Sequence, residues 1–202
     1  MISELTVIAE TYPSFFVMLH LFAMVLVLGG ATYSDLLLMY FLDDLKISRK
    51  EAGIIKRMAQ VILIGIVLAF LSGVMLFLPK PELLLETPKF LAKCVIFSVA
   101  VINGYVLHHV ILPKLINFSF LKEVYLIKKF NLRQAGFVAG AVSVVCWYSI
   151  FLLGSFRNNP FSFQQLMIVY VTVLVLAVCS ALIIEKTVKK LCAKKISKAS
   201  KK

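Results

Sequence analysis

The segment Thr11–Ser34 reads TYPSFFVMLHLFAMVLVLGGATYS and contains no Asp, Glu, Lys or Arg. A helix needs about 20 apolar residues to cross the ~30 Å hydrocarbon core of a bilayer, so this segment is long enough to span a membrane. Four more uncharged segments of comparable length follow it, at residues 58–79, 94–113, 134–156 and 158–184. The backbone finds no water to bond to inside a bilayer, so each segment is expected to be helical. The sequence therefore predicts an all-α polytopic membrane protein with a bundle of five transmembrane helices.

The element boundaries follow from these segments and from the charged residues that flank them. The transmembrane helices are expected at residues 13–42, 53–78, 88–112, 134–156 and 160–185, in one transmembrane domain that covers residues 1–202. Residues 116–130 are too few to span a bilayer, but their apolar residues alternate with lysines at roughly helical spacing. This pattern predicts an interfacial amphipathic helix on the cytoplasmic surface of the membrane.

The distribution of charge predicts the orientation of the chain. Only 16% of the residues are charged, whereas about 25% is typical of a soluble domain. Of the 22 Lys and Arg residues, 18 lie in residues 41–57, 114–133 and 185–202, which share one side of the predicted bundle, and 4 lie on the other side. Positively charged loops stay in the cytoplasm, so we expect the N-terminus outside, the C-terminus in the cytoplasm and a location in the cell inner membrane.

The same distribution bears on the partners of the chain. The basic side is expected to attract the anionic headgroups of the lipid bilayer. The net charge of +12 does not indicate a nucleic-acid partner, because it is concentrated beside the membrane. A homo-oligomer and another membrane protein both remain open as partners. The four cysteines are scattered and form no CxxC pair, so neither a disulfide framework nor a zinc site is expected.

Ionisable residues inside membrane helices are costly and are candidates for functional sites. His20 and Lys93 are expected near the outer ends of the first and third helices, and Asp35 and His108 near the inner ends of the same helices. Fifteen residues separate the two positions in each helix, which corresponds to ~22 Å of helix rise and to broadly one face. We therefore expect two layers. The outer layer contains His20 and Lys93, the inner polar cluster contains Asp35, Arg57, His108 and His109, and Asn103 lies between them.

Each of these residues also has a purely structural interpretation. Lys93 would extend its amine to the outer headgroups, and His109 would face the cytoplasmic boundary. Asp35 and Arg57 would form an ion pair that only stabilises the fold. His20 would be a neutral imidazole that donates a hydrogen bond to a backbone carbonyl, since a histidine in an apolar stretch needs a partner.

Three stretches of the sequence resemble a known group of compact helical membrane proteins. They are LHLFAMVLVLGG (19–30), KRMAQVILIGIVLAFLSGVMLF (56–77) and PKFLAKCVIFSVAVINGYVLHH (88–109). Over these helices the chain resembles the HemJ-type protoporphyrinogen oxidases and the CopD-like copper-resistance membrane domains. The resemblance implies a b-type haem, with His20 as its metal ligand and Lys93 as a second cofactor-binding residue.

Two details limit what this resemblance implies. HemJ-type proteins carry a Pro-Arg segment at the end of the first helix, where this chain reads TYSDLLLMYF (32–41), so the resemblance extends to the fold and the haem site and not to a reaction. Imidazole is a common axial ligand of haem. Because His20 and His108 lie near opposite membrane faces, a haem bound by His20 would need another second ligand, such as Met24 or Met75.

Two hypotheses about function therefore stay open. The first is a haem-binding or redox-related membrane protein that uses His20 and Lys93, with no catalytic residue assigned. The second is a small transporter or an accessory membrane subunit without enzymatic activity. In that case Asp35, Arg57 and His108 would form a cluster that responds to protons or ions.

Overall fold

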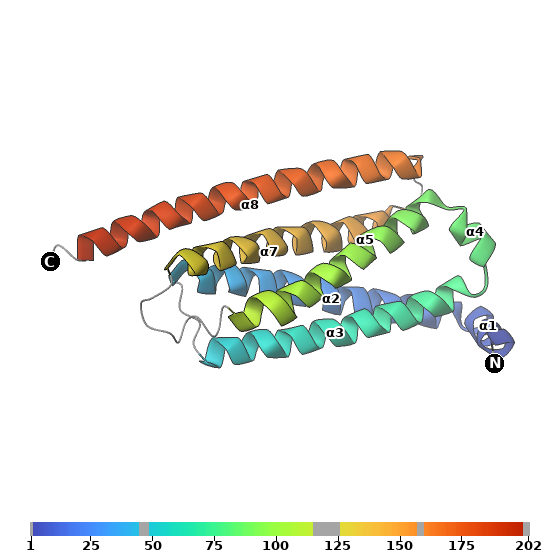
Figure 1. Cartoon of the computed structure of the whole chain (residues 1–202). Coiled ribbons are helices and arrows are strands. Elements are labelled where there is room, and N and C mark those ends of the chain that lie inside the picture. Colours follow the sequence, from blue (N-terminus) through green and yellow to red (C-terminus); the bar gives the residue numbers. More distant parts are fainter. Residues whose placement is uncertain (1, 45–48, 115–125, 157–159, 200–202) are drawn as a thin grey trace.

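The computed structural model describes residues 2–44, 49–114, 126–156 and 160–199, and these residues form helices and no strand. Five of the helices are long and apolar enough to cross a membrane, which confirms the predicted fold class. They are α2 (Pro13–Asp44), α3 (Arg49–Phe77), α5 (Pro88–Tyr105) with its continuation η1 (Val106–Ile111), α7 (Leu126–Ser155) and α8 (Phe163–Ala199). The short helix α1 (Ile2–Thr11) precedes α2, and α4 (Pro81–Leu85) joins α3 to α5 (Figure 1).

The ends of the helices follow from local sequence. Pro79 and Pro81 flank Lys80 directly after α3, and proline cannot continue a helix because it lacks the backbone N–H. Both α4 and α5 begin with a proline in their first turn, where that missing N–H costs nothing. All five long helices expose large apolar side chains on their outer faces, as expected for helices surrounded by lipid.

The closest packing in the bundle is between α2 and α3. A Cβ atom on Gly65 of α3 would lie 2.7 Å from Val27 Cγ2 and 3.2 Å from the Val27 backbone nitrogen on α2. Gly65, Ala69 and Gly73 recur at four-residue spacing, and this stripe of small residues allows the two backbones to approach closely. On the other side of α2 lies α7, which also packs against α5 and α8. By contrast, α3 makes at most isolated contacts with α5 and η1.

The structure differs from the expected boundaries in several places. The short helices α1 and α4 were not expected, and α3 begins at Arg49 instead of residue 53. Residues 126–130, expected within the interfacial helix 116–130, form the start of α7, and residues 115–125 lie outside the described residues. The last helix continues to Ala199 instead of ending near residue 185. The third transmembrane helix changes from an α-helix to a π-helix over Val106–Ile111. Such π-helical turns are rare and frequently occur at functional sites.

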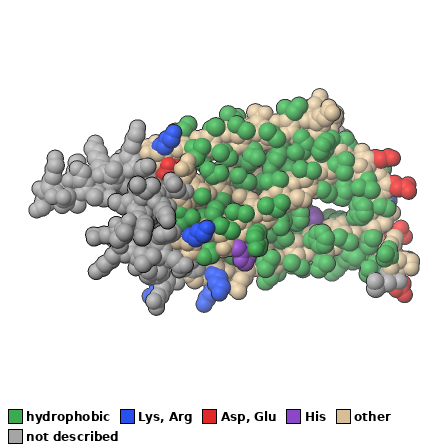
Figure 2. Space-filling model, viewed as in Figure 1, with side chains coloured by type: hydrophobic (Ala, Val, Ile, Leu, Met, Phe, Trp, Pro, Cys, Tyr) green, Lys and Arg blue, Asp and Glu red, His purple; other side chains and the backbone are tan. Residues whose placement is uncertain are grey.

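Charge is segregated along the bundle. Figure 2 shows Asp and Glu side chains gathered mainly at the end that carries α1 and α4, and Lys and Arg side chains mainly toward the opposite end. Between the two ends, hydrophobic side chains cover most of the face shown. We refer to these as the acidic end and the basic end of the bundle.

Candidate functional site

A cavity of about 750 Å³ lies in the half of the bundle nearer the basic end, and we call it the Asp35 cavity. Its wall combines residues of α2, α3, the α5–η1 helix and α7. Most of the wall is apolar. Its polar and aromatic side chains are Ser34, Asp35, Lys56, Tyr105, His108, His109, Ser143 and Trp147. Ala31, Ile62 and Trp147 belong both to this wall and to the buried core of the bundle, so the core closes the cavity toward the acidic end.

Asp35 is the acidic group of the described cavity wall, and only 8% of its surface is exposed. Ser143 of α7 forms a hydrogen bond with the carboxyl group. The other oxygen, Oδ2, is buried and has no hydrogen-bond partner. A Cβ atom on Gly140 would lie 3.9 Å from Oδ1, an ordinary van der Waals distance, so α7 lies directly beside the carboxyl group. Because buried polar groups are nearly always paired in proteins, the unpaired Oδ2 requires an explanation.

His108 supplies a second unpaired group to the same cavity. Its Nδ1 atom is buried and lacks a hydrogen-bond partner. The residue lies in the middle of η1, where the wider helical turn changes the direction of the side chains relative to an α-helix. Among the side-chain nitrogen and oxygen atoms of the described residues, Asp35 Oδ2 and His108 Nδ1 are the two that are both buried and unpaired. Both atoms belong to side chains that line the Asp35 cavity.

The remaining residues of the expected inner cluster lie at its margin or outside it. His109 is exposed and its ring lies 4.6 Å, centroid to centroid, from the ring of Tyr105. Arg57 is exposed and does not line the cavity, whereas its neighbour Lys56 does. Asn103 donates a hydrogen bond of 2.9 Å to the Ala139 carbonyl of α7 and does not line the cavity.

His20 lies in the half of the bundle nearer the acidic end, at the interface of α2 and α3. Its Nδ1 atom is 3.1 Å from the Ala69 carbonyl oxygen and 3.0 Å from Ser72 Oγ. A carbonyl oxygen can only accept, so Nδ1 carries the proton and donates. The Ser72 hydroxyl in turn donates to the Leu68 carbonyl at 2.6 Å. The structural interpretation of His20, an imidazole that donates to a backbone carbonyl, therefore agrees with this geometry.

The same geometry leaves the second ring nitrogen of His20 available. No described residue forms a hydrogen bond with Nε2. A histidine that binds a metal usually donates its other N–H to a carbonyl or carboxylate, which fixes the ring and directs the free lone pair at the metal. Figure 2 shows a hollow in the apolar surface near the acidic end, with a histidine side chain at its edge.

Lys93 lies at the same end of the bundle as His20 and is close enough to interact with it electrostatically. A Cβ atom on Gly154, near the end of α7, would lie 4.0 Å from its amine. The like-charged Lys89 also acts on Lys93, and its amine donates to the Phe156 carbonyl at 2.7 Å. Lys93 is half-buried at this end of the bundle.

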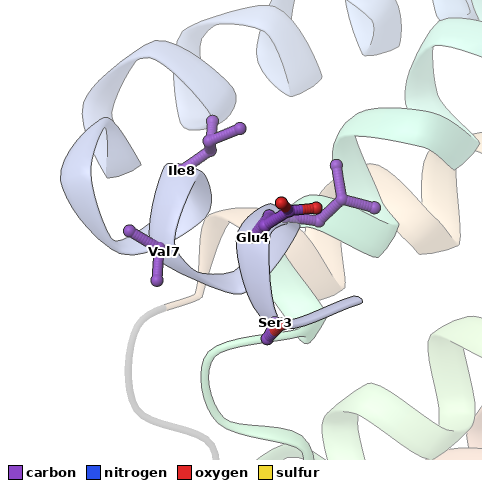
Figure 3. Close-up of a pocket in the computed structure, with 5 residues that line it drawn as sticks. Ser3, Glu4, Val7 and Ile8 are labelled. Carbon is purple, nitrogen blue, oxygen red and sulfur yellow. The ribbon is translucent and has the colours of Figure 1, made fainter. Parts of the chain in front are cut away.

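A second cavity, of about 620 Å³, lies against α1 (Figure 3). Ser3, Glu4, Leu5, Val7 and Ile8 line it, and they all come from this one short helix. A binding site usually brings polar groups together from several elements. The Asp35 cavity has this property and the α1 cavity does not.

The described residues contain no group of three or more His, Cys, Asp or Glu side chains that could hold a metal ion. Comparison with protein-family models, with curated proteins and with solved structures finds no match to this chain. The function must therefore be inferred from the geometry of the site itself. Five polar or aromatic residues of that site were not singled out from the sequence: Ser34, Lys56, Tyr105, Ser143 and Trp147.

Proposed function

We propose that this chain is a small membrane transport protein that binds a cation in the Asp35 cavity. The observation that carries the proposal is the unpaired Oδ2 of Asp35, buried in the wall of a cavity of about 750 Å³ within the span of the membrane helices. An isolated carboxylate in an apolar environment is costly, so a cation or a proton has to neutralise it. A cavity that contains such a group is suited to hold a cation reversibly.

The side chains around Asp35 favour the exchange of a proton for a cation over a permanent ion pair within the protein. The titratable side chains that share the cavity are Lys56 of α3, Tyr105 of α5, and His108 and His109 of η1. No described side chain forms an ion pair with the Asp35 carboxyl, whose one hydrogen bond comes from the neutral Ser143. A proton and a cation therefore compete for the same oxygen. Binding of one displaces the other, which is the basis of coupled transport.

The charge segregation supports an orientation for this site. The basic end of the bundle faces the cytoplasm in our proposal, in keeping with the excess of Lys and Arg on that side. The N-terminus is then outside, the protein resides in the cell inner membrane, and the Asp35 cavity lies in the cytoplasmic half of the bundle. Anionic lipid headgroups would interact with the basic end.

The experiment that tests the proposal uses protein reconstituted into liposomes that contain a pH-sensitive dye. Sodium, potassium or ethidium is added outside while an imposed pH gradient is followed. In the wild type at least one of these cations should accelerate the decay of the gradient, and Asp35→Asn should abolish the acceleration. Glu86→Gln, which removes an exposed carboxylate from the acidic end, should have no effect. Equal rates for wild type and Asp35→Asn with every cation would exclude the proposal.

A second candidate, haem binding at His20, is supported by one specific observation. The Nδ1–H of His20 is held by the Ala69 carbonyl and Ser72 Oγ, an arrangement that suits an axial ligand coordinating through Nε2. His20 thus fits the role of one ligand, and the amine of Lys93 at the same end would pair with a carboxylate of the haem. A bound haem would supply electron-transfer chemistry. Met24 packs into the core cluster, which does not favour it as the second ligand.

A further inference from the structure

The wall of the Asp35 cavity restricts the class of cation that it can hold. Inorganic cations such as Mg²⁺ and Ca²⁺ take about six to eight oxygen ligands. Among the described wall residues, the side chains with oxygen atoms are Ser34, Asp35, Tyr105 and Ser143. Aliphatic residues and the ring of Trp147 make up most of the rest. One carboxylate in an apolar and aromatic wall matches a cation that carries apolar groups of its own, because aromatic faces attract such cations.

The size and shape of the cavity agree with a ligand of that class. Its volume of about 750 Å³ lies within the range of about 300–1,000 Å³ that is usual for drug-sized ligands. Along α3 the wall extends from Gly53 to Ile66. Thirteen residues of helix rise correspond to roughly 20 Å, so the cavity extends from near the basic end toward the middle of the membrane.

The cavity also opens on the side of the bundle. Leu63 of α3 and Tyr105 of α5 both line it, yet 61% and 63% of their surfaces are exposed. The two helices do not pack closely against each other, so these residues stand at the two sides of an opening toward the bilayer. At the basic end the margin includes the cation Lys56, which disfavours the entry of another cation from the water.

We infer that the Asp35 cavity binds a hydrophobic organic monocation that enters from the bilayer between α3 and the α5–η1 helix. This inference rests on the proposed function and adds the ligand class and the route of entry. Asp35 would neutralise the charge, and Trp147 with the aliphatic wall would contact the apolar groups. A proton would compete with the ligand for Asp35.

Tetraphenylphosphonium is a suitable probe, because it is a hydrophobic monocation and tetraphenylborate is an anion of the same shape. Purified full-length protein in detergent is dialysed against the radiolabelled probe, and the fluorescence of Trp147, the single tryptophan of the chain, is recorded in parallel. We expect saturable binding of tetraphenylphosphonium, quenching of Trp147 and no competition from sodium. In a separate dialysis, tetraphenylborate should not bind. Asp35→Asn should weaken binding by roughly thirtyfold or more, as for other buried charge pairs that lose one partner.

A second set of variants tests the size of the ligand. Gly104 lines the cavity, and a Cβ atom there would meet nothing within 4 Å. Gly104→Leu should therefore occupy part of the cavity and weaken binding of tetraphenylphosphonium strongly, whereas Gly104→Ala should retain it. Trp147→Leu should weaken binding by about two- to thirtyfold. If the variants fold poorly, the wild type alone still tests the inference, because lowering the pH should weaken binding as a proton occupies Asp35.

The outcomes separate this inference from the proposed function. No binding of tetraphenylphosphonium, together with Asp35-dependent exchange of sodium or potassium in liposomes, would overturn the ligand class and leave the transport proposal intact. Binding that is unchanged in Asp35→Asn and in Gly104→Leu would place the probe outside this cavity and overturn the inference. A phospholipid that copurifies in the cavity and that the probe does not displace would also overturn it.

Discussion

Asp35 Oδ2 on α2 and His108 Nδ1 on η1 are both buried, both without a hydrogen-bond partner, and both part of side chains in the wall of one cavity. The carboxylate can only accept a hydrogen bond, whereas an imidazole nitrogen can donate or accept depending on its protonation. The two groups come from helices far apart in the sequence, and the π-helical turn of η1 contributes to the position of His108. Leaving one buried polar group unpaired costs about 1–3 kcal/mol, so each of these two groups lowers the stability of the fold.

The first prediction concerns the effect of Asp35 on the stability of the protein. Asp35→Asn should leave the thermal stability of the protein unchanged or raise it, because the substitution removes a charge that no described residue compensates. Glu185 is a matched control, since it is buried to a similar degree (5% exposed) but does interact with a neighbour. Glu185→Gln should lower the stability by about 1–3 kcal/mol, or about 2–4 °C in melting midpoint for each kcal/mol.

Intrinsic fluorescence measures both variants, because Trp147 is the single tryptophan and is buried. Detergent-solubilised protein is heated and the change in emission is recorded. A clear loss of stability in Asp35→Asn, comparable with that in Glu185→Gln, would mean that the carboxyl group holds the bundle together and would weaken the assignment of the cavity as a binding site.

The second prediction concerns the contact of α2 with α3. Gly65→Ala places a methyl group 2.7 Å from Val27 Cγ2 and 3.2 Å from the Val27 backbone, and a buried β-branched residue has little freedom to move. We expect a loss of about 1–3 kcal/mol in the free energy of unfolding. Gly29→Ala on α2 is the control, because its Cβ would meet nothing within 4 Å. It should be neutral or stabilising, since alanine favours a helix by up to about 1 kcal/mol over glycine.

Thermal unfolding of the two glycine variants in the same detergent tests this difference. Equal melting midpoints would show that α2 and α3 can separate slightly without cost. The stripe of Gly65, Ala69 and Gly73 would then not determine how the two helices pack.

The five membrane helices were predictable because a bilayer imposes length and apolarity, both of which are visible in a single sequence. The π-helical turn was not predictable, since its hydrogen-bond pattern depends on how η1 packs against its neighbours rather than on the apolar residues of Val106–Ile111. The start of α7 at Leu126 was missed because apolar residues that alternate with lysines fit an extended membrane helix as well as a separate one.

The residues of the Asp35 cavity could likewise be predicted only in part from the sequence. Depth along a helix follows from residue number, so the placement of Asp35 and His108 near one end could be argued from the sequence. The rotation of each helix about its axis, which decides which side chains face the cavity, could not be argued from the sequence. Lys56 and Arg57 are neighbours that point about 100° apart, and only the packing of α3 decides that Lys56 lines the cavity. Ser143 and Trp147 carry no charge, and their spacing of four on one helix face was the available signal.

The third prediction concerns orientation. We expect a reporter that fluoresces only in the cytoplasm to give signal when it is fused to the C-terminus, because 18 of the 22 Lys and Arg residues lie in the segments 41–57, 114–133 and 185–202, which are predicted to share the cytoplasmic side. The same reporter at the N-terminus should be dark. A dark, well-expressed C-terminal fusion would invert the topology and would place the Asp35 cavity in the outer half of the membrane.

The last prediction concerns haem at His20. If the protein binds a b-type haem, purified protein should show a Soret absorbance band, and His20→Ala should abolish the band by removing an axial ligand. His108→Ala should leave the band intact, because His108 lines the Asp35 cavity in the other half of the bundle. The same substitution should instead change cation exchange in liposomes. Equal loss of the band in both variants would contradict the placement of His20 and His108 in opposite halves of the bundle. A protein that incorporates no haem during expression with added haem would leave His20 as a structural donor to the Ala69 carbonyl.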